Sequence, residues 1–249
     1  MATSGWLMAM TAALVLGLML ATAAPAEAQA STPVRILPLG DSITQGGRND
    51  REEYTYRQPL FRMLKDAGAD FDFIGSTRTG LHGDAKWPDH NGEPMDLDHE
   101  GHYGWKTAAV RDKLAEWMKQ YPAAPDIVLI HLGTNDQDAK DHQKAIVEPL
   151  TDMIRMLREA NPKVVVLVGH LNFNGGAAAQ IRPLVEAMAK DRNTEASPVR
   201  TVHHYQGWNE DPNHAQTDTF DWAHPNPSGQ EKMARKWFEA MQPFLQLKQ

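Results

Sequence analysis

Three short polar segments hold the residue types that could carry out hydrolytic chemistry. Ser42 ends a Gly-Asp-Ser triplet, Asn135 stands inside Gly-Thr-Asn-Asp, and Asp221 precedes His224 by three residues. A serine hydroxyl is a weak nucleophile and needs an adjacent base. Histidine can take up that proton and return it to the leaving group, and an aspartate can orient the imidazole. These residue types therefore predict acyl transfer, in which a side-chain amide such as that of Asn135 stabilises the oxyanion.

The remaining sequence predicts the scaffold that must bring these residues together. Apolar runs that predict strands cover residues 34–39, 71–74, 126–132, 163–169 and 199–203. Helical patterns cover residues 56–67, 107–121, 143–160, 177–191 and 227–245. Continuous apolar strands are typical of a parallel sheet that is covered on both faces. We therefore expect an α/β protein with a three-layer α/β/α sandwich, in which ligands bind at the carboxyl ends of the strands.

The predicted elements carry further positional signals. Pro149 predicts a kink within its helix, and Asn226 followed by Pro227 predicts the start of the last helix. The stretches 76–104 and 206–224 show neither strand nor helix patterning. Irregular stretches of that length are uncommon in a compact domain unless they are functional.

Four sequence blocks resemble, in order, those of the SGNH (GDSL-type) hydrolase superfamily, which is named for its Ser, Gly, Asn and His. The blocks surround Ser42, Gly104, Asn135 and His224, and the resemblance runs from about Arg35 to the last predicted helix. The superfamily fold is flavodoxin-like, with a five-stranded parallel sheet, which agrees with the strands predicted above.

The resemblance also implies a role for each site residue. Ser42 would be the nucleophile, His224 the base and Asp221 the third member of a catalytic triad. The oxyanion hole would consist of the backbone N–H groups of Ser42 and Gly104 and the side-chain amide of Asn135.

A finer resemblance is to carbohydrate esterase family 3. Residues 41–46, 56–60 and 98–105 resemble segments of that family. Its members remove acetyl groups from xylan and related sugars. The resemblance therefore implies a secreted serine esterase whose partner is an O-acetylated polysaccharide such as acetylxylan, or another small acyl ester, and which needs no cofactor.

Two of these assignments have rivals in the sequence. The Asp-x-x-His spacing occurs three times, at Asp96/His99, Asp211/His214 and Asp221/His224. Only the third pair stands directly before the last predicted helix, so we favour His224, with His214 as the main rival. Gly101 competes with Gly104 for the oxyanion hole, and we favour Gly104 because Trp105 follows it.

Residues near the predicted site could also contact substrate. Flat aromatic faces suit sugar rings, and four tryptophans lie in or beside the irregular stretches, namely Trp87, Trp105, Trp208 and Trp222. Each could instead pack over the core. The candidates for substrate binding are Asp41, Trp105 and Trp222. We also expect Asp41 and Asp136 to hydrogen-bond nearby groups locally, and not to act as a carboxylate pair.

The sequence contains 11 histidines, which raises the question of a metal site. Several stand close together, namely His99, His102, His203 and His204. Their spacing fits no H-E-x-x-H or similar motif, and His131 and His170 fall in or at the end of predicted strands, where core histidines are expected. We therefore expect no metal site.

The N-terminal segment is typical of a secretory signal peptide. Residues 1–26 carry no charged side chain, and Ala-x-Ala sites end at Ala28 and Ala30. We expect a signal peptide over residues 1–30, cleaved after Ala28 or Ala30, and a secreted or periplasmic protein that does not contact the membrane after cleavage. The segment departs from the signal-peptide pattern in lacking Lys or Arg near its start. An uncleaved membrane anchor is the alternative, because the apolar run approaches the length needed to span a membrane.

The composition also excludes or disfavours several kinds of function. The 249 residues include 25 Lys and Arg against 32 Asp and Glu, so no basic surplus favours nucleic acid. The absence of Cys excludes disulfides, thiolate metal sites and a cysteine nucleophile. We expect one catalytic domain over residues 31–249, acting as a monomer. The alternatives are a lipase, thioesterase or aryl esterase of the same superfamily, or a sugar-binding module that has lost catalysis.

Overall fold

The structure is a computed structural model that describes residues 1–2, 32–47, 54–245 and 247. The chain divides into two units, Met1–Ser31 and Thr32–Gln249. Apart from residues 1 and 2, the predicted signal peptide lies outside the described residues, so it stays a prediction. Among the described residues, none of the helices has the length and apolar character needed to cross a membrane.

A parallel sheet organises the second unit. Its main path runs in the order β2-β1-β6-β7-β8, which is the strand order of flavodoxin-like folds. These strands are β1 Val34–Gly40, β2 Phe71–Phe73, β6 Ile127–His131, β7 Val165–Gly169 and β8 Val199–Val202. The five predicted strands and the predicted fold class are therefore confirmed.

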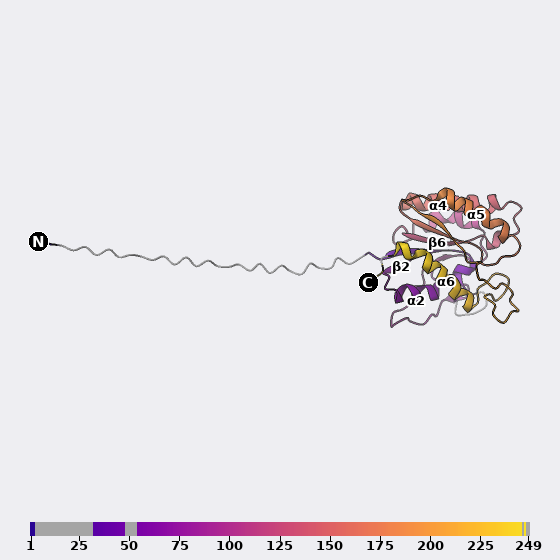
Figure 1. Ribbon diagram of the computed structural model, residues 1–249, viewed down its shortest axis with the longest axis horizontal. Helices are drawn as coiled ribbons and strands as arrows, with labels where there is room; N and C mark the ends of the chain where they lie inside the picture. The colour runs from indigo at the N-terminus through magenta and orange to yellow at the C-terminus, as the bar shows by residue number, and fades with distance from the viewer. Residues whose placement is uncertain (3–31, 48–53, 246, 248–249) are drawn as a thin grey trace. The chain divides into compact units, whose positions relative to one another are not determined.

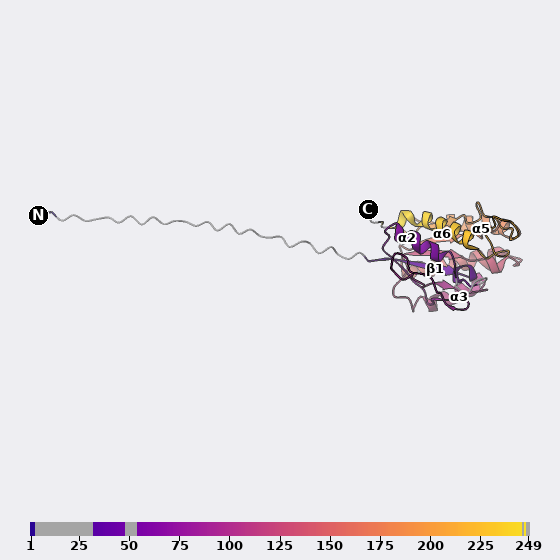
Figure 2. The ribbon, with the colours of Figure 1, turned by 90° about the horizontal axis from the view of Figure 1, so that it is seen from below.

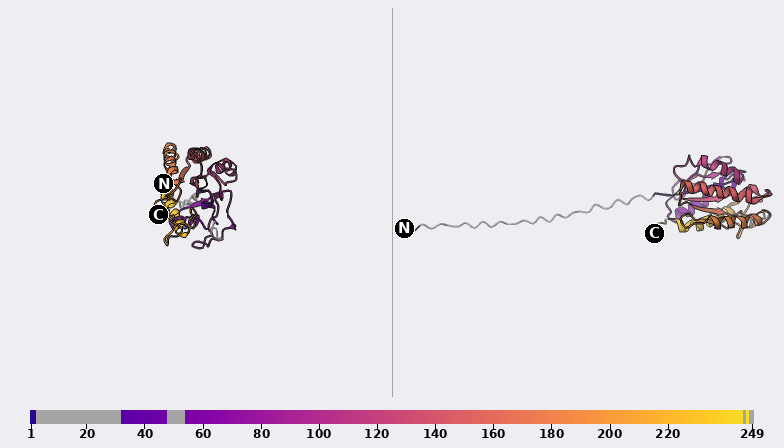
Figure 3. Two further views of the ribbon diagram at one scale, coloured as in Figure 1. Left: turned by 90° about the vertical axis from the view of Figure 1, so that its right-hand side faces the viewer. Right: turned by 90° about the horizontal axis from the view of Figure 1, so that it is seen from above.

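Helices cover both faces of this sheet and complete the three layers. On one face lie α2 (Arg57–Asp66) and α6 (Pro227–Met241), which pack against each other (Figure 2). The opposite face carries α3 (Thr107–Trp117), α4 (Glu148–Ala160) and α5 (Ala178–Arg192). Figures 1 and 3 show α4 and α5 side by side on that face.

Alternate residues of the strands supply two apolar cores. In β1, Leu37 and Leu39 face α3, α4 and α5, whereas Ile36 faces α2 and α6. In β6, Val128 and Leu129 divide in the same way, and all five of these side chains are fully buried. Burial on both faces is the physical reason for the unbroken apolar runs in the sequence.

Short elements modify the predicted pattern. The stretch 76–104 is not wholly irregular: β3 (Thr79–Gly80) and β4 (Gly83–Asp84) form an antiparallel pair. In addition, β5 (Glu100–Gly101) pairs with the carboxyl end of β1. This pairing brings the segment that contains Gly104 to the end of the strand that precedes Ser42.

The predicted helix over residues 143–160 is interrupted near its proline. The structure has a π-helical turn over Gln143–Val147, and α4 begins only at Glu148, with Pro149 in its first turn. Proline lacks the N–H that would bond the preceding turn, and this loss favours the change in hydrogen-bond pattern seen just before Pro149. The start of α6 is as predicted, because the Asn226 side chain accepts a hydrogen bond from the Gly229 N–H over 3.1 Å.

Candidate active site

The nucleophile candidate stands where β1 turns sharply into a single helical turn, α1 (Ser42–Gln45). The Asp41 carboxylate caps this turn by accepting a hydrogen bond from the Ile43 N–H over 3.0 Å. Gly40 is needed at the end of β1, because a Cβ there would lie 2.3 Å from Thr44 Oγ1 and 2.7 Å from the His131 carbonyl oxygen. The Gly-Asp-Ser triplet is thus a tight turn that presents Ser42.

Ser42, His224 and Asp221 are linked by consecutive side-chain hydrogen bonds. Ser42 Oγ lies 2.9 Å from His224 Nε2 although 182 residues separate them. On the other side of the imidazole, Nδ1 lies 3.0 Å from Asp221 Oδ1 and 2.9 Å from Oδ2. An acceptor carboxylate at Nδ1 selects the tautomer that carries its proton there and leaves Nε2 free to accept from the serine.

The backbone fixes the Asp221 carboxylate. Its Oδ1 accepts hydrogen bonds from the backbone N–H groups of Ala223 over 2.9 Å and His224 over 2.8 Å. Partial burial opposes the charge of Asp221, but these bonds and the nearby His224 outweigh burial and lower its pKa. The carboxylate is therefore ionised at neutral pH, which suits a group that stabilises a protonated imidazole.

Asn135 lies in a 3-10 turn, Thr134–Asp136, that follows β6. Its Nδ2 donates a hydrogen bond to the Trp105 carbonyl oxygen over 3.0 Å and lies 3.5 Å from Asp41 Oδ2. The next residue, Asp136, accepts from the Thr107 N–H over 3.0 Å and from the Thr107 hydroxyl over 2.7 Å, which ties the turn to the start of α3. Asp136 therefore has a structural contact, but its partner lies on α3 and not, as expected, in its own loop.

The two candidate oxyanion glycines differ in their backbone amides. The Gly101 N–H donates to His99 Nδ1 over 3.0 Å and is thus already used. Gly104 adopts a positive φ of 75°, and a side chain there would meet no atom within 4 Å. The preceding residue is held in place, because the Tyr103 N–H donates to Gln45 Oε1 over 2.7 Å.

Two buried charged residues hold these segments by hydrogen bonds, and the sequence patterns singled out neither of them. Arg57 is 1% exposed; its Nε donates to the Thr44 carbonyl oxygen over 2.9 Å and its Nη2 to that of Gln45 over 3.3 Å. The guanidinium therefore holds the end of α1. An arginine amid the apolar positions of a predicted helix was the available signal.

Glu100 is the second of these residues and is fully buried. It accepts hydrogen bonds from the N–H and hydroxyl groups of Ser76 over 2.9 and 2.8 Å and from the Tyr121 hydroxyl over 2.7 Å. It also lies 2.6 Å from His102 Nε2. Since Glu100 belongs to β5, this network anchors the segment that leads to Gly104.

Burial also acts on the carboxyl group of Asp41. The residue has no exposed surface, and burial raises the pKa of Asp41 to about 7, against the opposing effect of the Ile43 hydrogen bond. Direct contact between this carboxyl group and a substrate is not available at such burial. Any effect of Asp41 on substrate would act through Ser42 or Asn135, which it flanks.

His214 and His99, the alternatives to His224, have other hydrogen-bond partners than Ser42. His214 is exposed, and its Nδ1 lies 2.8 Å from Asn209 Nδ2. His99 is fully buried, and its Nδ1 accepts from the Gly101 backbone. Of the three Asp-x-x-His pairs, the structure brings His224 to Ser42.

The tryptophans near the site divide into packed and exposed ones. Trp87 and Trp208 are each 8% exposed and belong to the core. Trp105 packs against His102 and Trp117 at ring-centroid distances of 4.8 and 5.5 Å. Trp222 is 57% exposed and lies within the segment that carries Asp221 and His224.

A cavity of about 290 Å³ opens beside the nucleophile. Ser42 and His224 form one side, and Tyr54 and Phe220 contribute aromatic walls. Phe220 is 41% exposed and thus extends to the surface. Across the site, the Tyr103 ring lies parallel to the His224 ring with their centroids 6.0 Å apart.

Known proteins share this arrangement of elements. A multidomain esterase from Ruminococcus flavefaciens is 27% identical over 253 residues, which cover 92% of this chain and 31% of that protein. The chain thus spans about a third of the length of this curated relative. Crystal structures of an acetyl esterase mutant with an acetate ion and of a carbohydrate esterase family 3 protein from Talaromyces cellulolyticus are each 25% identical, with a TM-score of 0.67. Each alignment covers 85% of this chain and 97% of the other.

A family comparison agrees with these likenesses and with the resemblance to SGNH hydrolases. Residues 39–232, which include Ser42, Gly104, Asn135 and His224, match one family over most of the chain. The chain belongs to the GDSL-like lipase/acylhydrolase family.

Proposed function

We propose that this chain is a secreted serine esterase that removes O-acetyl groups from a polysaccharide such as acetylxylan. The observation that carries the proposal is the hydrogen-bonded row Ser42–His224–Asp221 beside a cavity of about 290 Å³. The likeness to an acetyl esterase and to a carbohydrate esterase family 3 protein supports the acetyl specificity. The apolar N-terminal segment supports secretion.

In the acylation step, Ser42 Oγ attacks the ester carbonyl carbon while its proton passes to His224 Nε2. Asp221 stabilises the imidazolium that forms. The carbonyl oxygen becomes an oxyanion, which accepts hydrogen bonds from Asn135 Nδ2 and from the backbone N–H groups of Ser42 and Gly104. The tetrahedral intermediate then collapses, the ester C–O bond breaks, and His224 donates its proton to the leaving sugar oxygen.

Deacylation repeats the same path with water. His224 Nε2 takes a proton from a water molecule, whose oxygen attacks the acetyl carbon on Ser42. The second oxyanion occupies the same hole. When the intermediate collapses, the bond to Ser42 Oγ breaks, the serine recovers its proton from His224, and acetate leaves. Every proton taken up by His224 is thus returned, and the cycle needs only water.

The shape of the site favours a small acyl group on a large alcohol. The pocket beside Ser42 is partly open to solvent, and its enclosed part is small. The exposed rings of Phe220 and Trp222 lie on the segment that bears His224 and offer flat apolar surface to a sugar. Trp222 is therefore the substrate-binding candidate that the structure best supports.

The test is acetate release from acetylated xylan, together with hydrolysis of p-nitrophenyl esters of increasing chain length. We expect activity that falls beyond the acetyl ester and that Ser42→Ala lowers by several orders of magnitude. Activity that rises toward long chains would favour a lipase instead. A chain that binds xylan but shows no Ser42-dependent hydrolysis of any ester would overturn the proposal in favour of a sugar-binding module.

A further inference from the structure

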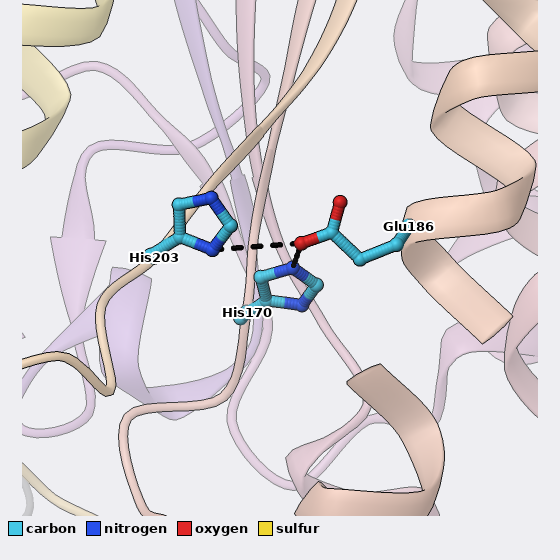
Figure 4. A group of neighbouring side chains, drawn as sticks. All are labelled: His170, Glu186 and His203. Atoms are coloured by element: carbon cyan, nitrogen blue, oxygen red, sulfur yellow. Dashed lines mark hydrogen bonds and ion pairs between the residues drawn. The ribbon is translucent and has the colours of Figure 1, made fainter. Parts of the chain in front are cut away.

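Two histidines and a glutamate converge on one point at the far side of the sheet from β2. His170 directly follows β7, His203 directly follows β8, and Glu186 lies on α5. Figure 4 shows one nitrogen of each ring turned toward the same carboxylate oxygen of Glu186. His170 Nε2 lies 2.8 Å and His203 Nδ1 3.5 Å from that oxygen, Oε1. One potential ligand atom from each residue lies within 4.8 Å of the other two.

We propose that His170, Glu186 and His203 bind one divalent transition-metal ion, with Zn²⁺ as the best match. Two imidazoles and one carboxylate suit zinc better than magnesium or calcium, which prefer oxygen ligands. Three protein ligands leave one position of a tetrahedral zinc for water. The side chains of Glu186 and His203 are 43% and 39% exposed, so solvent can reach the ion.

The spacing is close to what zinc requires. Ligand bonds of about 2.0–2.1 Å in a tetrahedron place the ligand atoms about 3.3 Å from one another. The distance of 3.5 Å between His203 Nδ1 and Glu186 Oε1 fits this value, and the 2.8 Å between His170 and Glu186 must open by about 0.5 Å.

The His203 nitrogen itself points to a ligand. Its Nδ1 is buried and has no hydrogen-bond partner among the described residues, although it faces a carboxylate. A buried polar atom without a hydrogen bond destabilises a fold. A metal ion between His203 and Glu186 would satisfy this nitrogen.

Two neighbouring groups act on this cluster, one by orienting the Glu186 carboxylate and one by its positive charge. The Thr201 hydroxyl donates to the second oxygen of Glu186, Oε2, over 3.2 Å, and such outer contacts are typical of metal ligands. The positive charge of Arg182, which stacks on the Tyr205 ring, acts on His170 and opposes a cation.

This site is separate from the candidate active site. Its strands β7 and β8 are the second and third along the sheet from β1, which carries Ser42, and the two sites share no residue. The expectation of no metal rested on spacing along the chain. The three ligands are 16 and 17 residues apart, on three elements, so no short motif could reveal them.

The experiment measures zinc binding by isothermal titration calorimetry on the full chain after chelation and dialysis. We expect one zinc per chain for the wild type and for Ser42→Ala. His203→Ala and Glu186→Gln should weaken binding by more than about 100-fold, and Thr201→Val by about tenfold. Arg182→Met, which removes the opposing positive charge, should tighten zinc binding. Both ligand variants alter partly exposed side chains, and thermal unfolding in the absence of zinc checks that they fold.

The matched control is His214→Ala, which removes an exposed histidine outside the cluster and should leave zinc affinity unchanged. Co²⁺ should give the intense visible absorption of a four-coordinate site in the wild type, and His203→Ala should abolish it. A wild type without saturable zinc binding would overturn the proposal. So would zinc binding that His203→Ala and His214→Ala weaken equally, because exposed histidines in general would then bind the ion. Ester hydrolysis by Ser42 plays no part in any of these outcomes.

Discussion

Asn135 donates its side-chain amide to the backbone carbonyl of Trp105 over 3.0 Å. This contact uses one of the two hydrogens on Nδ2 and fixes the plane of the amide, so the second hydrogen has a defined direction. Trp105 in turn is held by ring contacts with His102 and Trp117. A donor that is oriented before the reaction stabilises an oxyanion more than one that must reorganise.

Replacing Asn135 by alanine should therefore lower kcat by about 10²–10³, because one oxyanion donor is lost. Hydrolysis of p-nitrophenyl acetate measures the effect, and KM should change much less. The matched control is Gln137→Ala, which removes a side chain that donates to the Thr134 carbonyl oxygen in the same loop. A kcat for Asn135→Ala within threefold of the wild type would exclude the amide from the oxyanion hole.

Asp221→Asn should lower kcat by about 10⁴, the cost seen when a triad carboxylate becomes an amide. The amide oxygen can still accept the two backbone N–H bonds, so the loop should keep its shape while the imidazole loses its preferred tautomer. Asp211→Asn is the control, because Asp211 and His214 have the same spacing in the sequence. An equal loss of kcat in both variants would mean that Asp221 has no specific role in catalysis.

Gly104→Ala should impair catalysis through its backbone. A positive φ of 75° costs an alanine about 1–2 kcal/mol, and relief of this strain would rotate the N–H away from the oxyanion. Gly92→Ala is a matched control, since Gly92 has a φ of 82° and equally open surroundings. Urea unfolding should show similar destabilisation of both variants, whereas kcat should fall only in Gly104→Ala. A fall of kcat in both would point to global instability.

Glu100→Gln should lower the free energy of unfolding by about 2–3 kcal/mol, because an amide group would replace an oxygen that accepts two buried hydrogen bonds. Urea denaturation measures this. Glu116→Gln, which removes one charge of an exposed ion pair with Lys113, should change stability by less than about 1 kcal/mol. If the two variants are equally stable, the Glu100 network does not hold the segment before Gly104.

The buried Asp41 predicts a pH dependence of stability. Its folded pKa of about 7 lies above the unfolded value of 3.8, so the folded state binds the proton more tightly. The free energy of unfolding contributed by this group is therefore complete below about pH 4 and is lost as the pH rises to about 7, by at most about 1.4 kcal/mol per pH unit. Asp41→Asn, which keeps a capping side chain, should remove this contribution. Parallel stability–pH curves for the wild type and Asp41→Asn would contradict the prediction.

The amino-acid sequence was sufficient to predict the fold class. Strands buried on both faces need apolar residues at every position, and β6 and β7 show this directly. The Ser42 turn and the Asp221–His224 pair are local, so a few neighbouring residues specify them. Pro149 and Asn226 likewise act within a single helical turn.

The tertiary structure alone decided what depends on the meeting of distant segments. Three Asp-x-x-His pairs are alike in sequence, and only the packing of the last loop on the end of β1 brings His224 to Ser42. The N–H of Gly101 donates to His99 Nδ1 in the folded chain, and this hydrogen bond distinguishes Gly101 from Gly104. The cluster of His170, Glu186 and His203 depends on strand order, because parallel strands align their carboxyl ends wherever they lie in the chain, and spacing along the sequence does not record that order.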